Sequence, residues 1–379
     1  MTDVAQGRAP RLSLGGRINR LVASRRFQSW AARFPLTRRI ARAEGEALFD
    51  LVAGFVHSQV LMALVDLRIL HRLLDAPARP AALAGQVNVA PERLAVLMQA
   101  GAALGLLHLR RDGRYALARK GAALLGVPGL EAMIQHHAVL YRDLADPVAF
   151  LRGETDTELA GFWPYVFGAA AAGDGETAER YSDLMADSQA LVAEDTLDAV
   201  SLAGVRSLMD IGGGTGAFLT AVGQRWCQID LTLFDLPAVV PGARARFDHA
   251  GLTDRTRIVP GSFRDDPLPE GSGAISLIRV LYDHQDDTVR ALLASTRRAI
   301  APGGLLIVSE PMSGGQRPER AGDAYFALYC MAMRTGTVRS QAQIAALLQD
   351  AGFERIATPR PRRPFVTSIV TARAPVTLQ

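Results

Sequence analysis

The residues best placed to do chemistry lie between Ser207 and Gly216, which read Ser-Leu-Met-Asp-Ile-Gly-Gly-Gly-Thr-Gly. Apolar residues lead into Asp210, glycines follow it, and a helix-like run begins at Ala217. Glycine lets a backbone take positive φ and approach a ligand where a Cβ would collide. The helix start beyond it presents unpaired N–H groups to a polar or anionic group. The spacing therefore predicts a strand, a glycine turn and a helix that hold a nucleotide-like cofactor.

The glycine spacing alone leaves the cofactor open. Gly212, Gly214 and Ala217 also fit the G-x-G-x-x-G/A pattern of dinucleotide binders, and Asp235 follows where that pattern expects an acid. The candidates are a nicotinamide dinucleotide and S-adenosylmethionine. A turn that serves only strand–helix packing is the alternative without a ligand.

The composition bounds the class of protein. A chain of 379 residues with 49% hydrophobic and 21% charged residues has room for two folded domains. Cys227 and Cys330 lie far apart and form no metal-binding spacing or disulfide framework, so we expect no metal and a reducing cytoplasm. The N-terminus has no apolar signal-peptide core, and the apolar stretch from Leu51 to Val65 is too short to span a bilayer.

Residues 1–45 form a basic N-terminal arm. Its acids are Asp3 and Glu44, and its cations are Arg8, Arg11, Arg17, Arg20, Arg25, Arg26, Arg33, Arg38, Arg39 and Arg42. Leucine, isoleucine, tryptophan and phenylalanine alternate with the arginines. Such a segment either lies on an anionic membrane surface or packs its apolar stripe on its own domain or a dimer partner.

Residues 46–125 carry a winged-helix pattern. A broad apolar stripe from Glu44 to Leu74 predicts a buried helix, and short helices are expected at 81–87 and 92–104. Strands at 106–109 and 115–117 flank Asp112-Gly113, a hairpin turn. The candidate reading helix is mostly apolar, so the module is expected to dimerise and not to bind nucleic acid.

Residues 126–200 are predicted to be a mostly helical connector beside the substrate. It contains His136, Tyr141 and an aromatic run that begins at Phe162, and Met185 lies on a predicted helix from Tyr181 to Ala199. Such residues are usually core, and three of them, His136, Tyr141 and Met185, are the candidates that line a substrate cavity together with Tyr325.

Residues 201–379 alternate strands and helices, which predicts a parallel sheet covered on both faces. The strands are expected at 207–211, 229–234, 257–260, 274–280 and 305–309, with helices at 217–225, 238–249, 288–300 and 340–351. The last two strands, 353–358 and 365–372, have no helix between them and must pair antiparallel. This hairpin favours S-adenosylmethionine, because dinucleotide folds repeat the parallel unit instead.

From about Leu48 to its C-terminus, the chain resembles the two-domain small-molecule O-methyltransferases. The motifs that carry the resemblance stand in the family's order: Asp210-Ile-Gly-Gly-Gly-Thr-Gly216, Phe234-Asp-Leu-Pro237, Gly261-Ser-Phe263, Pro267-Leu-Pro269, Arg279-Val-Leu-Tyr-Asp-His284, Ala301-Pro-Gly-Gly304, Glu310-Pro311 and Ala351-Gly-Phe353. The resemblance implies a winged-helix dimerisation domain followed by a Rossmann-like class I methyltransferase sheet of the α/β class. It also implies a homodimer that uses S-adenosylmethionine without a metal.

The resemblance assigns the cofactor contacts to residues of these motifs. Asp235 would accept both ribose hydroxyls, Asp210 would help hold the ammonium group, and Phe263 would lie against adenine. The family commonly has Asp at the position of Ser262. The full set of expected cofactor residues is Asp210, Gly212, Gly214, Gly216, Asp235, Leu236, Ser262, Phe263 and Arg279.

The catalytic position departs from the family. The family's usual base is a histidine where this chain has Tyr282, so His284 becomes the candidate base, with Tyr282 and Asp283 orienting it. Glu310 matches a family glutamate, whereas Gln343 stands at the position of a second one. The alternative for His284 is a helix-start residue in the slot where relatives have tryptophan.

Within the family, the arginine-rich arm and the Tyr282-Asp-His284 sequence look most like the bacterial carotenoid enzymes of the hydroxyneurosporene or demethylspheroidene type. This likeness implies methylation of the hydroxyl of a long apolar acyclic carotenoid, in the cytoplasm or at the membrane surface of a photosynthetic bacterium. The alternatives are a bacteriochlorophyll-pathway C-methyltransferase, a polyketide O-methyltransferase, an NAD-dependent oxidoreductase and a winged-helix DNA-binding regulator.

Overall fold

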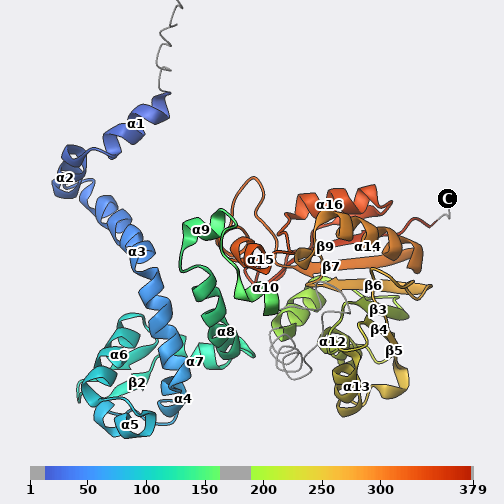
Figure 1. The fold of residues 1–379 in the computed structure, drawn as a ribbon, viewed down its shortest axis with the longest axis horizontal. Helices are drawn as coiled ribbons and strands as arrows, with labels where there is room; N and C mark the ends of the chain where they lie inside the picture. Colours follow the sequence, from blue (N-terminus) through green and yellow to red (C-terminus); the bar gives the residue numbers. More distant parts are fainter. Residues whose placement is uncertain (1–12, 163–188, 377–379) are drawn as a thin grey trace, which may run out of the picture. The chain divides into compact units, whose positions relative to one another are not determined.

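The computed structural model describes residues 13–162 and 189–376 of the chain. It forms two compact units, Met1–Arg119 and Lys120–Gln379, which are described separately (Figure 1). Met185 and the aromatic run from Trp163 to Tyr165 lie outside the described residues.

The first unit begins with three helices, α1 (Leu14–Val22), α2 (Arg25–Arg33) and α3 (Arg38–Asp66). The predicted long helix ends earlier than expected, because Arg68 takes a left-handed conformation (φ 53°) before the short α4 (Ile69–Arg72). The helices α5 (Pro80–Val87) and α6 (Pro91–Ala103) begin at prolines, which are favoured in the first turn. Strands β1 (Leu107–Leu109) and β2 (Tyr115–Leu117) then pair antiparallel, as the winged-helix pattern predicts.

Helix α3 begins six residues earlier than the sequence pattern indicated, and it is more exposed than the buried helix that was expected. It has 29 residues, and an 18-residue window of mean hydropathy 1.8 is only 11% buried. By length and composition α3 could cross a membrane, although the stretch 51–65 considered by itself is too short. One such helix is weak evidence for a span, because core helices of soluble proteins meet the same criteria. Its exposed side chains include Leu48, Phe49, Leu51, Val52 and Phe55.

Helix α7 (Arg119–Leu125) begins at the boundary between the units. The second unit continues with α8 (Leu130–Asp143), α9 (Pro147–Leu151) and α10 (Glu158–Phe162). Residues 189–199 are helical, as predicted for the end of the segment. The π-helix Arg320–Phe326 and α15 (Ala327–Met333) come from a stretch for which no element was predicted. Their residues Tyr329, Ala332 and Met333 share a buried cluster with Val139, Leu140, Phe150 and Leu159.

A seven-stranded sheet forms the rest of this unit, with the order β5-β4-β3-β6-β7-β9-β8. Its strands are β3 (Ser207–Ile211), β4 (Asp230–Asp235), β5 (Thr256–Pro260), β6 (Ser272–Ile278), β7 (Ile300–Glu310), β8 (Glu354–Ala357) and β9 (Ser368–Arg373). Strands β3 to β7 pair parallel, and β9 is antiparallel to both β7 and β8. The predicted terminal antiparallel pair is therefore confirmed.

Helices cover both faces of the sheet (Figure 1). One face packs on α14 (Asp286–Ala299) and α16 (Gln341–Asp350), and the other on α12 (Ala217–Arg225) and α13 (Val240–His249). Because β3, β4 and β6 are parallel neighbours, the loops that follow them meet at one edge of the sheet. These loops carry most of the expected cofactor residues.

Candidate active site

The glycine turn after β3 has the left-handed backbone conformation that its glycines allow. Gly212, Gly214 and Gly216 all have positive φ, at 68°, 60° and 75°. A Cβ on Gly216 would lie 2.4 Å from the Phe247 ring, whereas a Cβ on Gly214 would meet nothing within 4 Å. The turn is therefore packed tightly at its helix end and open at Gly214, where a ligand could approach the backbone.

Asp210 is fully buried below this turn. Its Oδ1 accepts a hydrogen bond from the Ser276 hydroxyl at 2.6 Å, whereas its Oδ2 has no hydrogen-bond partner in the described part of the chain. Burial raises the pKa of Asp210 to about 7, the Ser276 hydrogen bond opposes that rise, and the nearby Asp235 adds to it. A buried acceptor without a donor is costly, so Oδ2 marks a place for a ligand's donor group.

Asp235 ends β4 beside the glycine turn. Its two carboxylate oxygens accept one backbone hydrogen bond each, Oδ2 from Gly214 and Oδ1 from Leu236, both at 2.6 Å. Burial raises the pKa of Asp235, and the hydrogen bonds from Gly214 and Leu236 oppose the rise. Each oxygen keeps a second lone pair, so this carboxylate could also accept two vicinal hydroxyls.

Ser262 and Phe263 lie after β5, where an adenine contact was expected. Ser262 donates its hydroxyl to Asp265 Oδ2 at 3.0 Å and accepts from the Arg264 backbone, so this side chain holds a turn. The Phe263 ring meets His284 edge-on, with ring centroids 5.3 Å apart. Phe263 is half-buried and also packs against the core of the sheet, so its ring is held in place from both sides.

His284 is buried next to cations. Its Nδ1 lies 3.1 Å from an Arg264 guanidinium nitrogen, and Arg339 donates to its backbone carbonyl at 2.9 Å. Burial, reinforced by Arg264 and Arg339, lowers the pKa of His284 to about 4, which keeps the imidazole neutral at pH 7.

Tyr282 and Glu310 meet through the backbone. The Tyr282 amide donates to Glu310 Oε2 at 3.1 Å, and the Tyr282 hydroxyl lies 3.4 Å from an Arg279 guanidinium nitrogen. Burial raises the pKa of Glu310 to about 8. The described structure shows no hydrogen bond between Glu310 and His284, and Gln343 forms a capping box with Ser340 at the start of α16. Glu310 was expected to orient His284, and that contact is not seen among the described residues; Gln343, at the position of the second family glutamate, caps α16 instead.

A cavity of about 210 Å³ opens within the same unit, mostly between apolar side chains. His136, Arg279, Tyr325 and Tyr329 line it with polar groups, whereas Met133, Leu191, Pro311, Phe326, Phe365 and Val366 are among its apolar walls. His284 and Tyr282 are not among the lining residues. Arg279 directly follows β6 and has a left-handed conformation (φ 58°). A Cβ on Gly212 would lie 3.0 Å from its neighbour Val280. The cavity therefore lies next to the glycine turn.

Two histidine–tyrosine pairs join α8 to the π-helix and α15 at this cavity. His136 Nε2 lies 2.8 Å from the Tyr329 hydroxyl, and His137 Nε2 lies 2.5 Å from the Tyr325 hydroxyl. Burial and the neighbouring His137 lower the pKa of His136 to about 4, and burial raises the pKa of Tyr325 to about 12. Tyr141 is half-buried and does not line the cavity.

The sequence interpretation missed part of this cavity. Tyr329 and Phe326 lie on helices that were not predicted. Phe365 and Val366 were expected in the last strand, but β9 begins only at Ser368, so both lie in the connection before it. Arg363 ties that connection to the helix at 189–199 by an ion pair with the buried Asp195, at 3.0 Å. An aromatic cluster at helical spacing, Tyr325, Phe326 and Tyr329, was the available signal.

Comparison with known proteins identifies the family. A family model described as the O-methyltransferase domain matches residues 141–354, and one described as the O-methyltransferase dimerisation domain matches residues 49–126. The chain belongs to the O-methyltransferase family. It is therefore an S-adenosylmethionine-dependent O-methyltransferase with a dimerisation domain, which excludes the oxidoreductase and regulator alternatives.

Two curated relatives are similar over nearly their whole length. Demethylspheroidene O-methyltransferase of Cereibacter sphaeroides is 60% identical over 356 residues, which cover 94% of each chain. The enzyme of the same name from Rhodobacter capsulatus is 54% identical, over 94% of this chain and 90% of its own. Human N-acetylserotonin methyltransferase, solved in complex with S-adenosylmethionine, shares the fold with a TM-score of 0.72 at 24% identity, over 88% of this chain and 98% of its own.

The O-methyltransferase site fits S-adenosylmethionine on its own geometry. The open approach at Gly214, the unpartnered Oδ2 of Asp210 and the vicinal acceptors of Asp235 match a ligand with an ammonium group and a ribose diol. The described residues contain no group of three or more histidines, cysteines or acids that could hold a metal ion.

The raised pKa of Asp210 predicts that cofactor binding depends on pH. The free carboxyl is largely protonated below about pH 7, whereas a bound ammonium favours its ionised form, so affinity should rise with pH. We expect S-adenosylhomocysteine to bind roughly tenfold more weakly at about pH 6 than at about pH 8. Calorimetry checks this, with Asp210→Asn as the variant whose affinity should lose that dependence. Equal affinity of the native protein at both pH values would contradict the expected contact between Asp210 and the ammonium group.

Proposed function

We propose that this enzyme methylates the hydroxyl group of an apolar acyclic carotenoid of the demethylspheroidene or hydroxyneurosporene type. The observation that carries the proposal is the 60% identity, over 94% of both chains, to an enzyme named for demethylspheroidene. The mostly apolar cavity beside the glycine turn supports it, because a carotenoid end needs apolar walls and one polar spot for its hydroxyl.

The cofactor is proposed to lie along the loops after β3, β4 and β5. Asp235 holds the ribose hydroxyls, Asp210 faces the ammonium group, and Phe263 lies against adenine, with Leu236, Ser262 and the glycines shaping the backbone. S-Adenosylmethionine supplies an electrophilic methyl group when it is bound. Arg279 is proposed to face both this site and the acceptor cavity.

The acceptor's proton is proposed to leave through the pair of Tyr329 and His136. Both side chains line the cavity, and neutral His136 can accept at Nε2 from the Tyr329 hydroxyl when its own proton is on Nδ1. As the acceptor oxygen forms its new bond to carbon, its proton passes to Tyr329, whose own proton passes to His136. The lowered pKa of His136 does not prevent this, because a protonated ether is a far stronger acid than an imidazolium.

This assignment gives His284 a different role from that of a base. His284 packs edge-on against Phe263, and its Nδ1 faces the cation of Arg264. We propose that it supports the adenine-binding face, in the slot where relatives have tryptophan. Tyr282 is proposed to position Arg279 through its hydroxyl, and Glu310 to fix the backbone of Tyr282.

The four segments keep distinct proposed roles. Residues 46–125 are proposed to form a homodimer through the exposed apolar side chains of α3, residues 126–200 to line the substrate site, and residues 201–379 to hold the cofactor. A long apolar acceptor partitions into lipid, so we propose that the enzyme meets it from the cytoplasm at a membrane surface. The basic N-terminal arm, residues 1–45, is the segment that we propose contacts the membrane.

Purified enzyme with methyl-labelled S-adenosylmethionine tests the proposal. Detergent-dispersed hydroxylated acyclic carotenoids should become labelled, and the labelled product should be a methyl ether. A phenol, a bacteriochlorophyll precursor and a polyketide phenol serve as competing acceptors. Label that enters one of these, and not the carotenoid, would overturn the proposed substrate while leaving the methyltransferase activity intact.

A further inference from the structure

Helices α1 and α2 form an exposed segment with cations and apolar side chains side by side, which we call the arginine arm (residues 13–37). Each helix begins at a serine whose hydroxyl caps it, Ser13 accepting from Gly16 and Ser24 from Phe27. These caps stabilise two separate helices, which are divided at residues 23 and 24. It precedes the matched dimerisation domain, which begins at residue 49.

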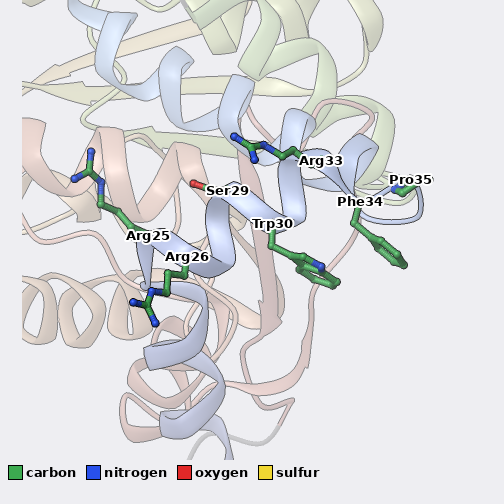
Figure 2. Close-up of a pocket in the computed structure, with 7 residues that line it drawn as sticks. All are labelled: Arg25, Arg26, Ser29, Trp30, Arg33, Phe34 and Pro35. Carbon is green, nitrogen blue, oxygen red and sulfur yellow. The ribbon is translucent and has the colours of Figure 1, made fainter.

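The apolar side chains of the arginine arm gather on helix faces that the described residues leave uncovered. In α1 they recur at Leu14, Ile18, Leu21 and Val22, the spacing of one helix face, and Leu14 is 77% exposed. Trp30 in α2 and Phe34 directly after it have stacked rings with centroids 4.9 Å apart, and these residues are 49% and 38% exposed. Figure 2 shows these two rings extending together on one side of α2 and the Arg33 side chain on the other.

Charge on the arginine arm has a single sign. Residues 13–37 contain no aspartate or glutamate, and their cations are Arg17, Arg20, Arg25, Arg26 and Arg33. Arg25, Arg26 and Arg33 line a groove on α2 together with Ser29, Trp30, Phe34 and Pro35. Guanidinium groups around an exposed indole suit the region where anionic headgroups meet acyl chains.

We propose that the arginine arm docks on an anionic lipid bilayer, with Trp30, Phe34 and the apolar face of α1 inserted between the headgroups. A second copy of the chain fits this surface poorly, because a symmetric contact would set these arginines against themselves. A nucleic acid would satisfy the cations but leave the apolar face in water. Of these three, an anionic bilayer alone can pair with the arginines and also bury the apolar face. Such a bilayer also dissolves an apolar acceptor. The link to the acceptor rests on the proposed function, whereas the docking does not.

Flotation of the full-length enzyme with lipid vesicles tests the proposal. We expect binding to phosphatidylglycerol–phosphatidylcholine vesicles, little binding to phosphatidylcholine alone, and weakening by salt. Replacing Arg25, Arg26 and Arg33 by glutamine should weaken binding by ~100-fold, since three cations near the surface contribute about 3 kcal/mol together and about 1.4 kcal/mol corresponds to a factor of ten. Trp30→Ser with Phe34→Ser should also weaken it, at unchanged charge.

A matched variant separates the arm from the protein's overall basic charge. Arg111, Arg298 and Arg360 are exposed in other parts of the chain, and replacing these three by glutamine removes the same net charge. Equal loss of binding in this control, or no binding of the native enzyme, would overturn the proposal. The proposal would also be overturned if the arm substitutions dissociated a dimer, or if the native enzyme bound duplex DNA more tightly than vesicles. The arm variants should still transfer label to an acceptor that is dispersed in detergent. The docking proposal and the substrate proposal can therefore be contradicted independently of each other.

Discussion

Asp235→Ala should weaken the binding of S-adenosylhomocysteine by ~100-fold or more while the protein remains folded. The carboxylate ends β4 with one backbone hydrogen bond on each oxygen, from Gly214 and Leu236. Two hydroxyls of a ribose can add to these, and hydrogen bonds to a charged group contribute about 1.5–3 kcal/mol each. Isothermal calorimetry measures the dissociation constant, and the melting temperature reports whether the fold survives.

Two further variants make this result specific. Asp235→Asn keeps the size and one acceptor oxygen, so its affinity should fall between those of the native enzyme and Asp235→Ala. Asp230→Ala removes an exposed carboxylate at the other end of the same strand and should bind S-adenosylhomocysteine as the native enzyme does. A folded Asp235→Ala protein with native affinity would show that the ribose lies elsewhere.

The parts of the fold set by local pattern could be predicted from the sequence. Strand β3 was expected at 207–211 and forms at Ser207–Ile211, because a short apolar run is bounded by a glycine turn. The terminal pair was deduced from the missing helix between 358 and 365, and β9 does run antiparallel to β7 and β8. The α/β class and the winged-helix hairpin follow from such local rules.

The acceptor side of the site could not be predicted in the same way. The π-helix at Arg320–Phe326 has no sequence signal comparable to a glycine turn, yet it brings Tyr325 and Phe326 to the cavity. His136 and Tyr329 are 193 positions apart and meet only through tertiary packing. His284 looked like a base because it stands two residues after Tyr282, but the backbone there carries its ring toward Phe263 and Arg264.

Substituting His136 by glutamine should lower the turnover number by ~100-fold or more, with S-adenosylhomocysteine affinity nearly unchanged. Loss of a positioned proton acceptor typically reduces a rate by about 10²–10⁴-fold. Glutamine can keep a hydrogen bond to the Tyr329 hydroxyl, so positioning survives while proton acceptance does not. Steady-state kinetics with labelled S-adenosylmethionine measure kcat and both KM values.

Variants of Tyr329 and His284 decide which histidine, His136 or His284, accepts the proton. If Tyr329 and His136 act as one relay, Tyr329→Phe combined with His136→Gln should cost little more than either substitution alone. His284→Ala should instead raise the KM for S-adenosylmethionine severalfold and leave kcat close to native, since it removes the ring that supports Phe263. The reverse pattern, with kcat lost in His284→Ala and kept in His136→Gln, would restore His284 as the base. In that case the acceptor's proton would leave through His284 in the motif after β6. The contact between His136 on α8 and Tyr329 on α15 would then only hold these helices together.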